Sequence, residues 1–474
     1  MTEILRADIC VIGAGSAGLS VAAGASQLGA GTVLIESQKM GGDCLNFGCV
    51  PSKALLAAAH AAHSARQAGG FGVKLPPPMI DFAAVNAHVQ SVIAAIAPHD
   101  SQERFQGLGA TVIRGAAAFT GPREIAAGDY RIRARRFVIA TGSTPFVPPL
   151  PGLDKLPYFT NETIFDLKKQ PRHLLVIGAG PIGCELAQAF RRLGAEVTIV
   201  EMSWLLPKDD PDAAALVRDR LKAEGVRLLE DTKVMHAVGA EGAITLALDG
   251  KNGPQIVTGS HLLIAAGRRP NFAGLELEKA GIASTTQGIT VDAGLRTSNR
   301  RVFAIGDVIG GLQFTHAAGY HASIVIRRAL FRLPATMKPG AIPWVTYTDP
   351  ELAQAGETEA SARQKGLDIT VTISPFASND RARTERDSDG FVKVISTKKG
   401  RVLGATIVGA QAGELIQVWC LAIAQGLKLS AIAGVVAPYP TRGETSKRAA
   451  GDFYAPRLFG ERTRRLIKFL RLLG

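Results

Sequence analysis

The sequence lacks any long hydrophobic run, and this absence argues against a membrane-spanning protein. No charge-free apolar stretch reaches about 18 residues, the length that a transmembrane helix requires. Charged residues are also sparse, at 20% of the 474-residue chain, while apolar residues make up 46%. This balance is typical of globular proteins and excludes a long disordered chain. Residues 1–6 are mixed in character, so we expect no signal peptide.

Cysteine is scarce as well, with five residues in the chain. Without a signal peptide, so few cysteines indicate a reducing, cytoplasmic compartment, where a disulfide is more often catalytic than structural. Basic residues outnumber acidic ones, and the formal net charge is +13. At about 150 residues per domain, the length predicts roughly three domains, each large enough to bury a core.

The strongest organisational signal is an internal repeat of two glycine-rich loops. The segments IGAGSAGL at 12–19 and IGAGPIGCE at 177–185 each follow a short apolar strand and open a helix. In each copy an acidic residue, Glu36 or Glu201, ends the next strand at the same distance from the loop. Two copies with the same spacing predict two βαβ units that each bind a dinucleotide.

The residues of each loop have separate expected roles. The first glycine makes a tight turn, the second lets the backbone approach a pyrophosphate, and the third lets the helix pack on the strand. These glycines are Gly13, Gly15 and Gly18 in the first loop and Gly178, Gly180 and Gly183 in the second. Glu36 and Glu201 lie where an acid binds a ribose hydroxyl. Because Glu201 would repel a 2′-phosphate, NADH is favoured over NADPH.

A cysteine motif, GGDCLNFGCVPSK, follows the first loop at residues 41–53. Cys49 lies five positions after Cys44, and an ideal helix would separate them by about 7.5 Å along its axis, too far for a disulfide. Gly48 permits an irregular turn that would close this gap. Two buried cysteines in a helix are the alternative interpretation, which the position between a dinucleotide loop and Lys53 makes less favourable.

These motifs resemble those of the class I pyridine nucleotide–disulfide oxidoreductases, which include mercuric reductase, dihydrolipoamide dehydrogenase and glutathione reductase. The resemblance runs from Ala7 to about Gly451. It implies an α/β fold of two doubly wound, Rossmann-like domains and a C-terminal α+β dimerisation domain. It also implies a homodimer in which NADH reduces FAD and FAD reduces a Cys44–Cys49 disulfide. Cys49 would lie against the flavin as a thiolate, and Cys44 would meet the substrate.

The same resemblance implies roles for further residues. Lys53 would lie near the flavin and pair with Glu185, because a buried cation needs a partner. Asp307 would bind the ribityl–phosphate region, and Thr315 and His316 would begin a helix whose positive end faces the flavin. For His316, packing at the helix start is an equal alternative. Further contacts are implied for FAD at Gly42, Gly115, Ala140, Thr141 and Gly142, and for NAD at Gly267.

Composition shifts along the chain predict its division into domains. A proline-rich stretch at 145–157 follows the first domain, and GRRPN at 267–271 ends the second. We expect an FAD-binding domain at 1–150 and 271–340, an NAD-binding domain at 151–270, a dimerisation domain at 341–455 and a basic amphipathic helix at 456–474. In the dimerisation domain we expect strands at 369–374, 391–396 and 402–408 and a helix at 412–425.

The C-terminal motif departs from the pattern of the family. Thiol-handling members carry His-Pro-Thr-x-x-Glu, whose histidine is the acid–base catalyst. Here residues 437–444 read APYPTRGE, so Tyr439 replaces that histidine while Glu444 is retained. A phenol titrates near about 10 and an imidazole near about 6.5, so Tyr439 is a poor base at neutral pH. The substitution is similar to mercuric reductase, although the C-terminal cysteine pair of the mercuric enzymes is missing after Cys420.

Three alternatives remain for the electron acceptor. The first is a soft metal ion or small-molecule oxidant, as in a mercuric-reductase-like enzyme. The second is lipoamide, in a dihydrolipoamide dehydrogenase whose base is replaced by Tyr439. The third is a quinone or protein partner reached at a membrane surface. We expect no resident metal, and we expect Cys10, Cys184 and Cys420 to be buried as small apolar residues.

Two basic segments complete the sequence features. Residues 131–136 hold four arginines, three of them at alternating positions, which predicts a solvated strand face and not a nucleic-acid site. In the tail, Leu466, Phe469, Leu470 and Leu473 share one helical face, opposite basic residues. Such a helix suits the inner face of an anionic membrane, or it packs on the dimerisation domain. The sequence leaves both alternatives open.

Overall fold

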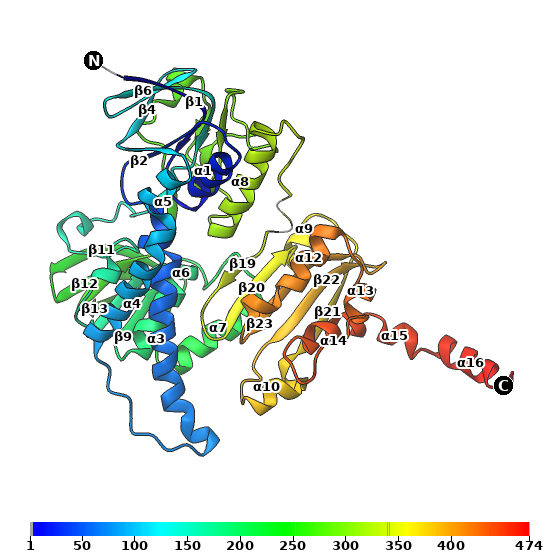
Figure 1. Ribbon diagram of the computed structural model, residues 1–474. Coiled ribbons are helices and arrows are strands. Elements are labelled where there is room, and N and C mark those ends of the chain that lie inside the picture. Colours follow the sequence, from blue (N-terminus) through cyan, green and yellow to red (C-terminus); the bar gives the residue numbers. More distant parts are fainter. Residues whose placement is uncertain (1–2, 252, 339, 341, 474) are drawn as a thin grey trace. The chain divides into compact units, whose positions relative to one another are not determined.

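A computed structural model describes residues 3–251, 253–338, 340 and 342–473 of the chain. Figure 1 follows the chain from the N-terminus in blue to the C-terminus in red. The chain forms two compact units, each built from three segments. The first unit contains residues 1–179, 189–202 and 231–337, and the second contains residues 180–188, 203–230 and 338–474. Each unit is described by itself below.

A sheet with a parallel core organises the first unit and carries the first glycine loop. Its strands run in the order β3-β2-β1-β6, and β18 pairs with β6 on a branch. The bounds are β1 Glu3–Ile12, β2 Thr32–Glu36, β3 Thr111–Arg114, β6 Tyr130–Ile139 and β18 Val302–Ala304. Helix α1 (Ser16–Gln27) connects β1 to β2, as the first βαβ unit requires. All these strands are parallel, so their carboxyl ends meet at one edge, where doubly wound sheets bind ligands.

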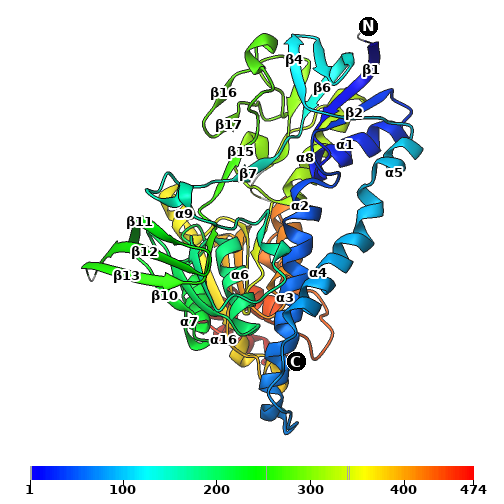
Figure 2. The ribbon, with the colours of Figure 1, turned by 90° about the vertical axis from the view of Figure 1, so that its left-hand side faces the viewer.

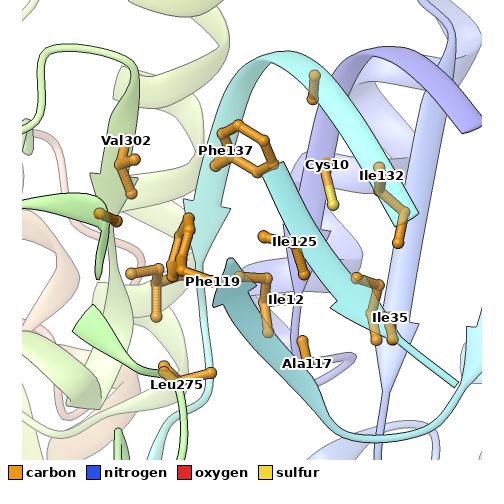
Figure 3. Packing of buried hydrophobic residues seen from close by; sticks show 14 of the residues in the cluster. Cys10, Ile12, Ile35, Ala117, Phe119, Ile125, Ile132, Phe137, Leu275 and Val302 are labelled. Atoms are coloured by element: carbon orange, nitrogen blue, oxygen red, sulfur yellow. The ribbon is translucent and has the colours of Figure 1, made fainter. Parts of the chain in front are cut away.

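Apolar side chains cover both faces of this sheet. On one face, Ile12, Ile35 and Phe137 pack with Phe119 in a buried cluster (Figure 3). The Phe119 and Phe137 rings meet edge to face with centroids 5.7 Å apart. Cys10 lies in the same cluster with no exposed surface, and burial raises the pKa of its thiol. Cys10 therefore behaves as the small apolar residue that the sequence predicts.

A second parallel sheet carries the second glycine loop. Strand β8 (His173–Ile177) lies between β9 (Glu196–Val200) and β14 (His261–Ile264), and α6 (Pro181–Arg192) follows β8 along the chain. The second βαβ unit is therefore where the repeat predicts it. A three-stranded antiparallel sheet, β11 to β13, was not anticipated from the sequence (Figure 2). Its strands expose apolar Met235, Val238 and Ile256, which weakens the alternation that marks a half-buried strand.

Further strands and helices complete the first unit. The strands are β4 Ala117–Gly121, β5 Glu124–Ala127, β7 Ser143–Pro145, β11 Thr232–Ala240, β12 Ala243–Gly250, β13 Gly253–Gly259, β15 Arg268–Pro270, β16 Ser284–Thr285 and β17 Gly288–Ile289. The helices are α2 Gly42–Asn46, α3 Cys49–Gln67, α4 Phe82–Ile96, α5 Gln102–Gly107 and α8 Thr315–Ala329. Short 3-10 helices lie at 68–71, 97–100, 153–155, 164–166, 277–280 and 306–309.

An antiparallel sheet of five strands organises the second unit. The order is β19-β20-β23-β22-β21, with bounds Trp344–Thr346, Glu351–Gly356, Val402–Gly409, Phe391–Thr397 and Ile369–Pro375. The sequence predicts β21, β22 and β23 but misses β19 and β20. The helix expected at 412–425 is divided into α11 (Ala412–Leu415) and α12 (Gln417–Gln425). Trp419 on α12 is fully buried and donates a hydrogen bond to the Ser446 hydroxyl at 3.1 Å.

The remaining elements of the second unit are short. They are α7 Pro211–Ala223, β10 Arg227–Leu229, α9 Glu359–Gln364, a 3-10 helix at 376–378, α10 Asp380–Thr384, α13 Leu429–Ala433, α14 Glu444–Asp452, α15 Ala455–Leu458 and α16 Glu461–Leu470. Cys184 is buried as expected, whereas Cys420 is half-buried against the core, and burial raises the pKa of its thiol to about 11.

The tail forms two helices where the sequence predicts one. Phe459 and Gly460 separate α15 from α16, and Leu473 lies beyond the end of α16. No side chain of α16 is buried, so its apolar face does not pack within the second unit as one of the two alternatives required. Among the residues that the structure describes, no helix combines the length and apolar character needed to cross a membrane.

Candidate active site

The first glycine loop is tightly packed against the end of the sheet. Gly13 has a φ of 101°, and a Cβ atom there would lie 2.4 Å from the Ala140 carbonyl oxygen. A Cβ on Gly18 would lie 1.8 Å from the Gly13 oxygen. Any side chain at either position would therefore break the loop. These contacts match the tight turn and the close helix packing that the motif predicts.

The second loop repeats this geometry. Gly178 has a φ of 108°, and a Cβ there would lie 2.4 Å from the Ala265 carbonyl oxygen. By contrast, a Cβ on Gly180 would meet no atom within 4 Å. The loop is therefore closed toward the sheet at its first glycine and open at its second, which leaves space where a pyrophosphate binds.

The two acids at the ends of the second strands also act alike. The Ala14 amide donates to Glu36 Oε2 at 2.6 Å, and the Ala179 amide donates to Glu201 Oε2 at 2.8 Å. Each carboxylate thus holds the residue after the first loop glycine, a role that the sequence reasoning missed. A carboxylate offers about four acceptor sites, so each acid retains capacity for the hydroxyls of a ribose.

Further residues expected to bind dinucleotides lie around the loops. The Gly115 amide donates to the Glu36 carbonyl at 2.9 Å, and the Thr141 hydroxyl donates to the Asn271 carbonyl. Gly142 and Gly267 have positive φ, and a Cβ on either would meet no atom within 4 Å. A Cβ on Gly42 would lie 2.7 Å from the Gly15 Cα, and a Cβ on Gly15 would lie 3.8 Å from the Gly42 Cα. The residues present fit FAD at the first loop and a nicotinamide dinucleotide at the second.

A break between two helices brings the two cysteines of the motif together. Helix α2 ends at Asn46 and α3 begins at Cys49, so the irregular turn that the sequence predicts is confirmed. The Asn46 amide donates to the Gly42 carbonyl at 2.8 Å, and a Cβ on Gly48 would lie 2.8 Å from Asp43 Oδ2. Cys44 and Cys49 are free thiols whose side chains lie close enough for each to shift the pKa of the other.

Electrostatics give the two sulfurs different protonation states. The neighbouring Cys44 thiol lowers the pKa of Cys49 to about 6, and the Thr315 hydroxyl and the charge of Lys53 add to this, while burial and Asp43 oppose it. The Thr315 oxygen lies 3.3 Å from the Cys49 sulfur. The neighbouring Cys49 and burial raise the pKa of Cys44. At neutral pH the pair therefore consists of a Cys49 thiolate and a Cys44 thiol.

A buried network next to the cysteines was not predicted. Arg268 donates through Nε to the Ser143 hydroxyl at 2.7 Å, and its Nη2 lies 3.2 Å from Asp43 Oδ1. The Ser143 hydroxyl donates to Asp307 Oδ2 at 2.6 Å, and burial raises the pKa of Asp307. The Asn161 amide donates to Asp43 Oδ1 at 3.0 Å. Arg268 thus joins the helix of Cys44 to the acid expected beside the flavin.

Two further expectations concern Lys53, Glu185 and His316. Lys53 lies in the first unit and Glu185 in the second, so their pairing stays a prediction. Within the second unit, Glu185 Oε1 accepts a hydrogen bond from the Tyr347 amide at 2.9 Å. Helix α8 begins at Thr315 as expected, and the exposed His316 ring stacks on Phe314 at 5.5 Å. A direct role of His316 at the flavin also stays a prediction.

Tyr439, in the second unit, is not placed to accept a proton at neutral pH. Its ring is 71% exposed, and its hydroxyl donates to Asp380 Oδ2 at 3.1 Å. This hydrogen bond, the charge of Asp380 and that of Glu444 raise the pKa of Tyr439 above its ordinary value. Glu444 accepts a hydrogen bond from the Thr441 amide at 3.3 Å. Tyr439 is therefore protonated at neutral pH.

Comparison with known proteins identifies the family. Residues 7–322 match the family described as pyridine nucleotide-disulphide oxidoreductase. The chain belongs to this family. Residues 342–450 match the dimerisation domain of the pyridine nucleotide-disulphide oxidoreductases, which supports a homodimer. Members of the family use FAD and NAD(P)H, and the expected α/β fold with a separate dimerisation domain is confirmed.

Individual relatives carry different names. A mercuric reductase from Streptomyces lividans and a dihydrolipoyl dehydrogenase from Thermus scotoductus are each 36% identical over 455 residues, which cover 94% of this chain and 96% of the relative. Among solved structures, the flavoprotein disulfide reductase RclA from Escherichia coli is 29% identical, with a TM-score of 0.83 over 94% of this chain and 99% of that chain. RclA has also been solved as a Cu(II) complex. Because the chain is equally identical in sequence to a mercuric reductase and to a dihydrolipoyl dehydrogenase, these relatives do not determine its electron acceptor.

Arg268 generates a prediction about the reactivity of Cys49. Arg268→Gln leaves the charge of Asp43 uncompensated, so we expect the pKa of Cys49 to rise by about one unit. Asp43→Asn removes that charge and should lower the pKa, and the double variant should return it toward the wild-type value. The rate of iodoacetamide alkylation of the reduced protein against pH reports the thiolate fraction, and peptide mass spectrometry assigns the reaction to Cys49.

Arg269→Gln is the matched control for this experiment. Arg269 is the next residue in the chain and lies over the Phe146 ring at 4.3 Å, away from the network. Its replacement should leave the alkylation profile unchanged. An unchanged profile for Arg268→Gln, together with a shifted profile for Asp43→Asn, would show that Arg268 does not screen Asp43.

Proposed function

We propose that this protein transfers two electrons from NADH, through FAD and the Cys44–Cys49 pair, to a soft metal ion of the Hg(II) type. The observation that carries the proposal is the combination of a Cys49 thiolate beside Cys44 with a protonated Tyr439 in place of a base. A disulfide substrate needs a proton donor when it is cleaved, whereas a metal ion that accepts electrons needs none.

The residues of the chain have distinct tasks in this scheme. Bound FAD supplies two-electron transfer between the nicotinamide and the disulfide. The glycine loops bind the two dinucleotides, and Glu201 disfavours a 2′-phosphate, which makes NADH the donor. The Thr315 hydroxyl and Lys53 stabilise the negative charge of the Cys49 sulfur. Cys44 keeps its proton until a substrate engages the pair.

The chemistry of the metal matches the two sulfurs. Soft cations select thiolate ligands, and Hg(II) binds two of them in a linear arrangement. The overall reaction balances as NADH + Hg²⁺ → NAD⁺ + Hg⁰ + H⁺. Among the described residues, no group of three or more His, Cys, Asp and Glu side chains is arranged to hold a resident metal ion. The names of the mercuric reductase relatives and the Cu(II) complex of RclA support a metal acceptor.

An acceptor panel tests the proposal. NADH is added anaerobically to the FAD-loaded protein, and flavin reoxidation is followed after adding Hg(II), Cu(II), lipoamide, oxidised glutathione or a naphthoquinone separately. We expect fast reoxidation with Hg(II), release of Hg⁰ vapour and at least about a hundredfold loss of this turnover in Cys44→Ser and Cys49→Ser. Only the reduced wild type and Cys44→Ser should show a long-wavelength thiolate–flavin band.

Two outcomes of the panel would contradict the proposal. Faster reoxidation by lipoamide than by Hg(II) would favour the dihydrolipoamide dehydrogenase alternative, to which a relative of equal identity belongs. Reoxidation by the naphthoquinone that survives in Cys44→Ser would place the acceptor at the flavin and not at the cysteines. Cys10→Ser is the control variant, because Cys10 is buried in the core away from solvent.

Tyr439→His tests why lipoamide is a poor acceptor. An imidazole titrates near about 6.5, and Asp380, which already binds the Tyr439 hydroxyl, and the charge of Glu444 favour its protonated form. General acid–base catalysis typically contributes about a hundredfold or more, so we expect lipoamide turnover to rise at least about tenfold. Steady-state kinetics from pH 6 to 8 provide the measurement. Tyr439→Phe has no titrating group and should not raise the turnover. High lipoamide turnover of the wild type with a neutral optimum would disprove the argument.

We also propose that α16 binds the inner face of an anionic membrane. Its apolar side chains Leu466, Phe469 and Leu470 are exposed. The basic residues of the helix and its end are Arg462, Arg464, Arg465, Lys468 and Arg471, against the single acid Glu461. Positive charge beside an exposed leucine and phenylalanine face suits anionic lipid headgroups and their acyl boundary. An acceptor held in or at the membrane would then be within reach.

Vesicle sedimentation tests this contact. The full chain should co-sediment with phosphatidylglycerol vesicles at low salt, not with phosphatidylcholine vesicles, and high salt should release it because surface charges are screened. Truncation after Gly460 should abolish binding while the dimer keeps its FAD. Loss of FAD or aggregation of the truncated chain would show that the tail is structural. A change from dimer to monomer would instead identify a second copy of this chain as the occupant of the helix face.

A further inference from the structure

Four arginines of the first unit gather where β18 begins, and none takes part in the chemistry described above. They are Arg136 on β6, Arg296, Arg301 and Arg332, here called the arginine cluster. The Phe137 amide donates to the Arg301 carbonyl at 3.0 Å, which places Arg301 beside Arg136. Arg296 forms an isolated bridge with Phe303, and its guanidinium lies 5.5 Å from the centre of that ring.

The neighbouring arginines of β6 differ from the cluster in having acidic partners. Arg131 and Arg133 contact Glu124 at 3.2 and 2.7 Å, and Arg135 contacts Asp8 at 3.2 Å. All three are exposed, so the solvated strand face that the sequence predicts holds for them. Arg136 does not follow this pattern, because it is half-buried.

The cluster has no counter-charge. Among the described residues, no carboxylate oxygen lies within the 4.0 Å of an ion pair from Arg136, Arg296, Arg301 or Arg332. The nearby Asp292 is engaged with backbone, since its Oδ1 accepts hydrogen bonds from the Gly294 and Arg296 amides at 2.8 and 2.9 Å.

Two buried nitrogens of the cluster also have no hydrogen-bond acceptor. These are Nε of Arg136 and Nε of Arg296. Burial, followed by the charges of Arg296, Arg301, Arg135 and Arg332, lowers the pKa of Arg136. A half-buried guanidinium surrounded by like charges costs free energy unless an anion compensates it.

We propose that the arginine cluster binds an anion that carries several phosphate charges, such as a diphosphate or triphosphate group. Guanidinium groups present paired N–H donors that match phosphate oxygens, and several of them together favour a polyvalent anion over chloride or a single carboxylate. The site is separate from the dinucleotide loops. Gly13 and Asp307 follow the carboxyl ends of β1 and β18, whereas Arg301 directly precedes the first residue of β18. FAD bound at the first loop therefore leaves the cluster accessible.

Binding of inorganic tripolyphosphate tests the site. The FAD-loaded dimer is first saturated with NAD⁺, so that neither dinucleotide loop is open to phosphate. Isothermal titration with tripolyphosphate, diphosphate and sulfate is then carried out at equal ionic strength. We expect affinity to increase with the number of phosphate groups, and we expect tripolyphosphate to raise the unfolding temperature.

The chain offers a matched pair of double variants. Arg136→Gln/Arg301→Gln removes two charges from the cluster and should weaken tripolyphosphate binding at least tenfold. Arg131→Gln/Arg133→Gln removes the same number of charges from β6, at positions already paired with Glu124, and should leave binding unchanged. Equal weakening in both variants would overturn the proposal, because it would show only a general response to net charge.

A single variant separates ligand binding from a structural role. Without added anion, Arg136→Gln should keep or raise the unfolding temperature, because it relieves repulsion among like charges. A lower unfolding temperature combined with unchanged tripolyphosphate affinity would overturn the proposal and make Arg136 a structural residue.

The phosphate of a lipid headgroup is a second ligand that the arginine cluster could recognise by the same chemistry. The chain truncated after Gly460 lacks the basic tail, so vesicles containing phosphatidic acid test the cluster alone. Competition of soluble tripolyphosphate against these vesicles would identify a lipid headgroup as a second ligand of the cluster. Tripolyphosphate binding without vesicle binding would assign it to soluble phosphates. Binding of neither probe would disprove the site.

Discussion

The interaction between the Cys44 and Cys49 side chains is what the proposed chemistry depends on, because it gives two identical side chains different charges. A continuous helix would separate them by about 7.5 Å and leave both as ordinary thiols. The break at Gly48 closes that distance, and the charge pair of Arg268 with Asp43 ties the broken segment to the rest of the unit. A local failure of helix geometry is therefore what makes one sulfur a thiolate at neutral pH.

The internal repeat extends from residue spacing to individual hydrogen bonds. Gly13 and Gly178 approach the backbone after a parallel strand at the same distance, and Glu36 and Glu201 hold equivalent amides. In each loop the acid thus holds the backbone through a hydrogen bond, while the second glycine leaves space for the pyrophosphate. A loop held in this way needs little further ordering when a dinucleotide binds, which reduces the entropic cost of binding.

The sequence was sufficient where function depends on neighbouring residues and insufficient where it depends on tertiary contacts. The glycine loops and the turn at Gly48 follow from local patterns and were predicted, and the start of α8 was implied by the family resemblance. The pairing of Arg268 with Asp43 joins residues that are far apart in the sequence, and no periodicity links them. The strands β11 to β13 were missed because exposed apolar residues blur the alternation on which prediction relies. The break of the expected helix at Ile416 was missed as well.

Arginine has three different environments in this chain, and the position of the nearest carboxylate decides which one applies. Arg131 is exposed and paired, so it contributes little to stability and no ligand is needed to explain it. Arg268 is half-buried, with 10% of its side chain exposed, and is paired with Asp43, and its charge is used within the protein to support a thiolate. Arg136 is also half-buried but has no acidic partner among the described residues. Burying a guanidinium without an acidic partner costs free energy. An unpaired positive charge therefore indicates an anion-binding site where the arginine is partly buried, and an exposed or paired arginine does not.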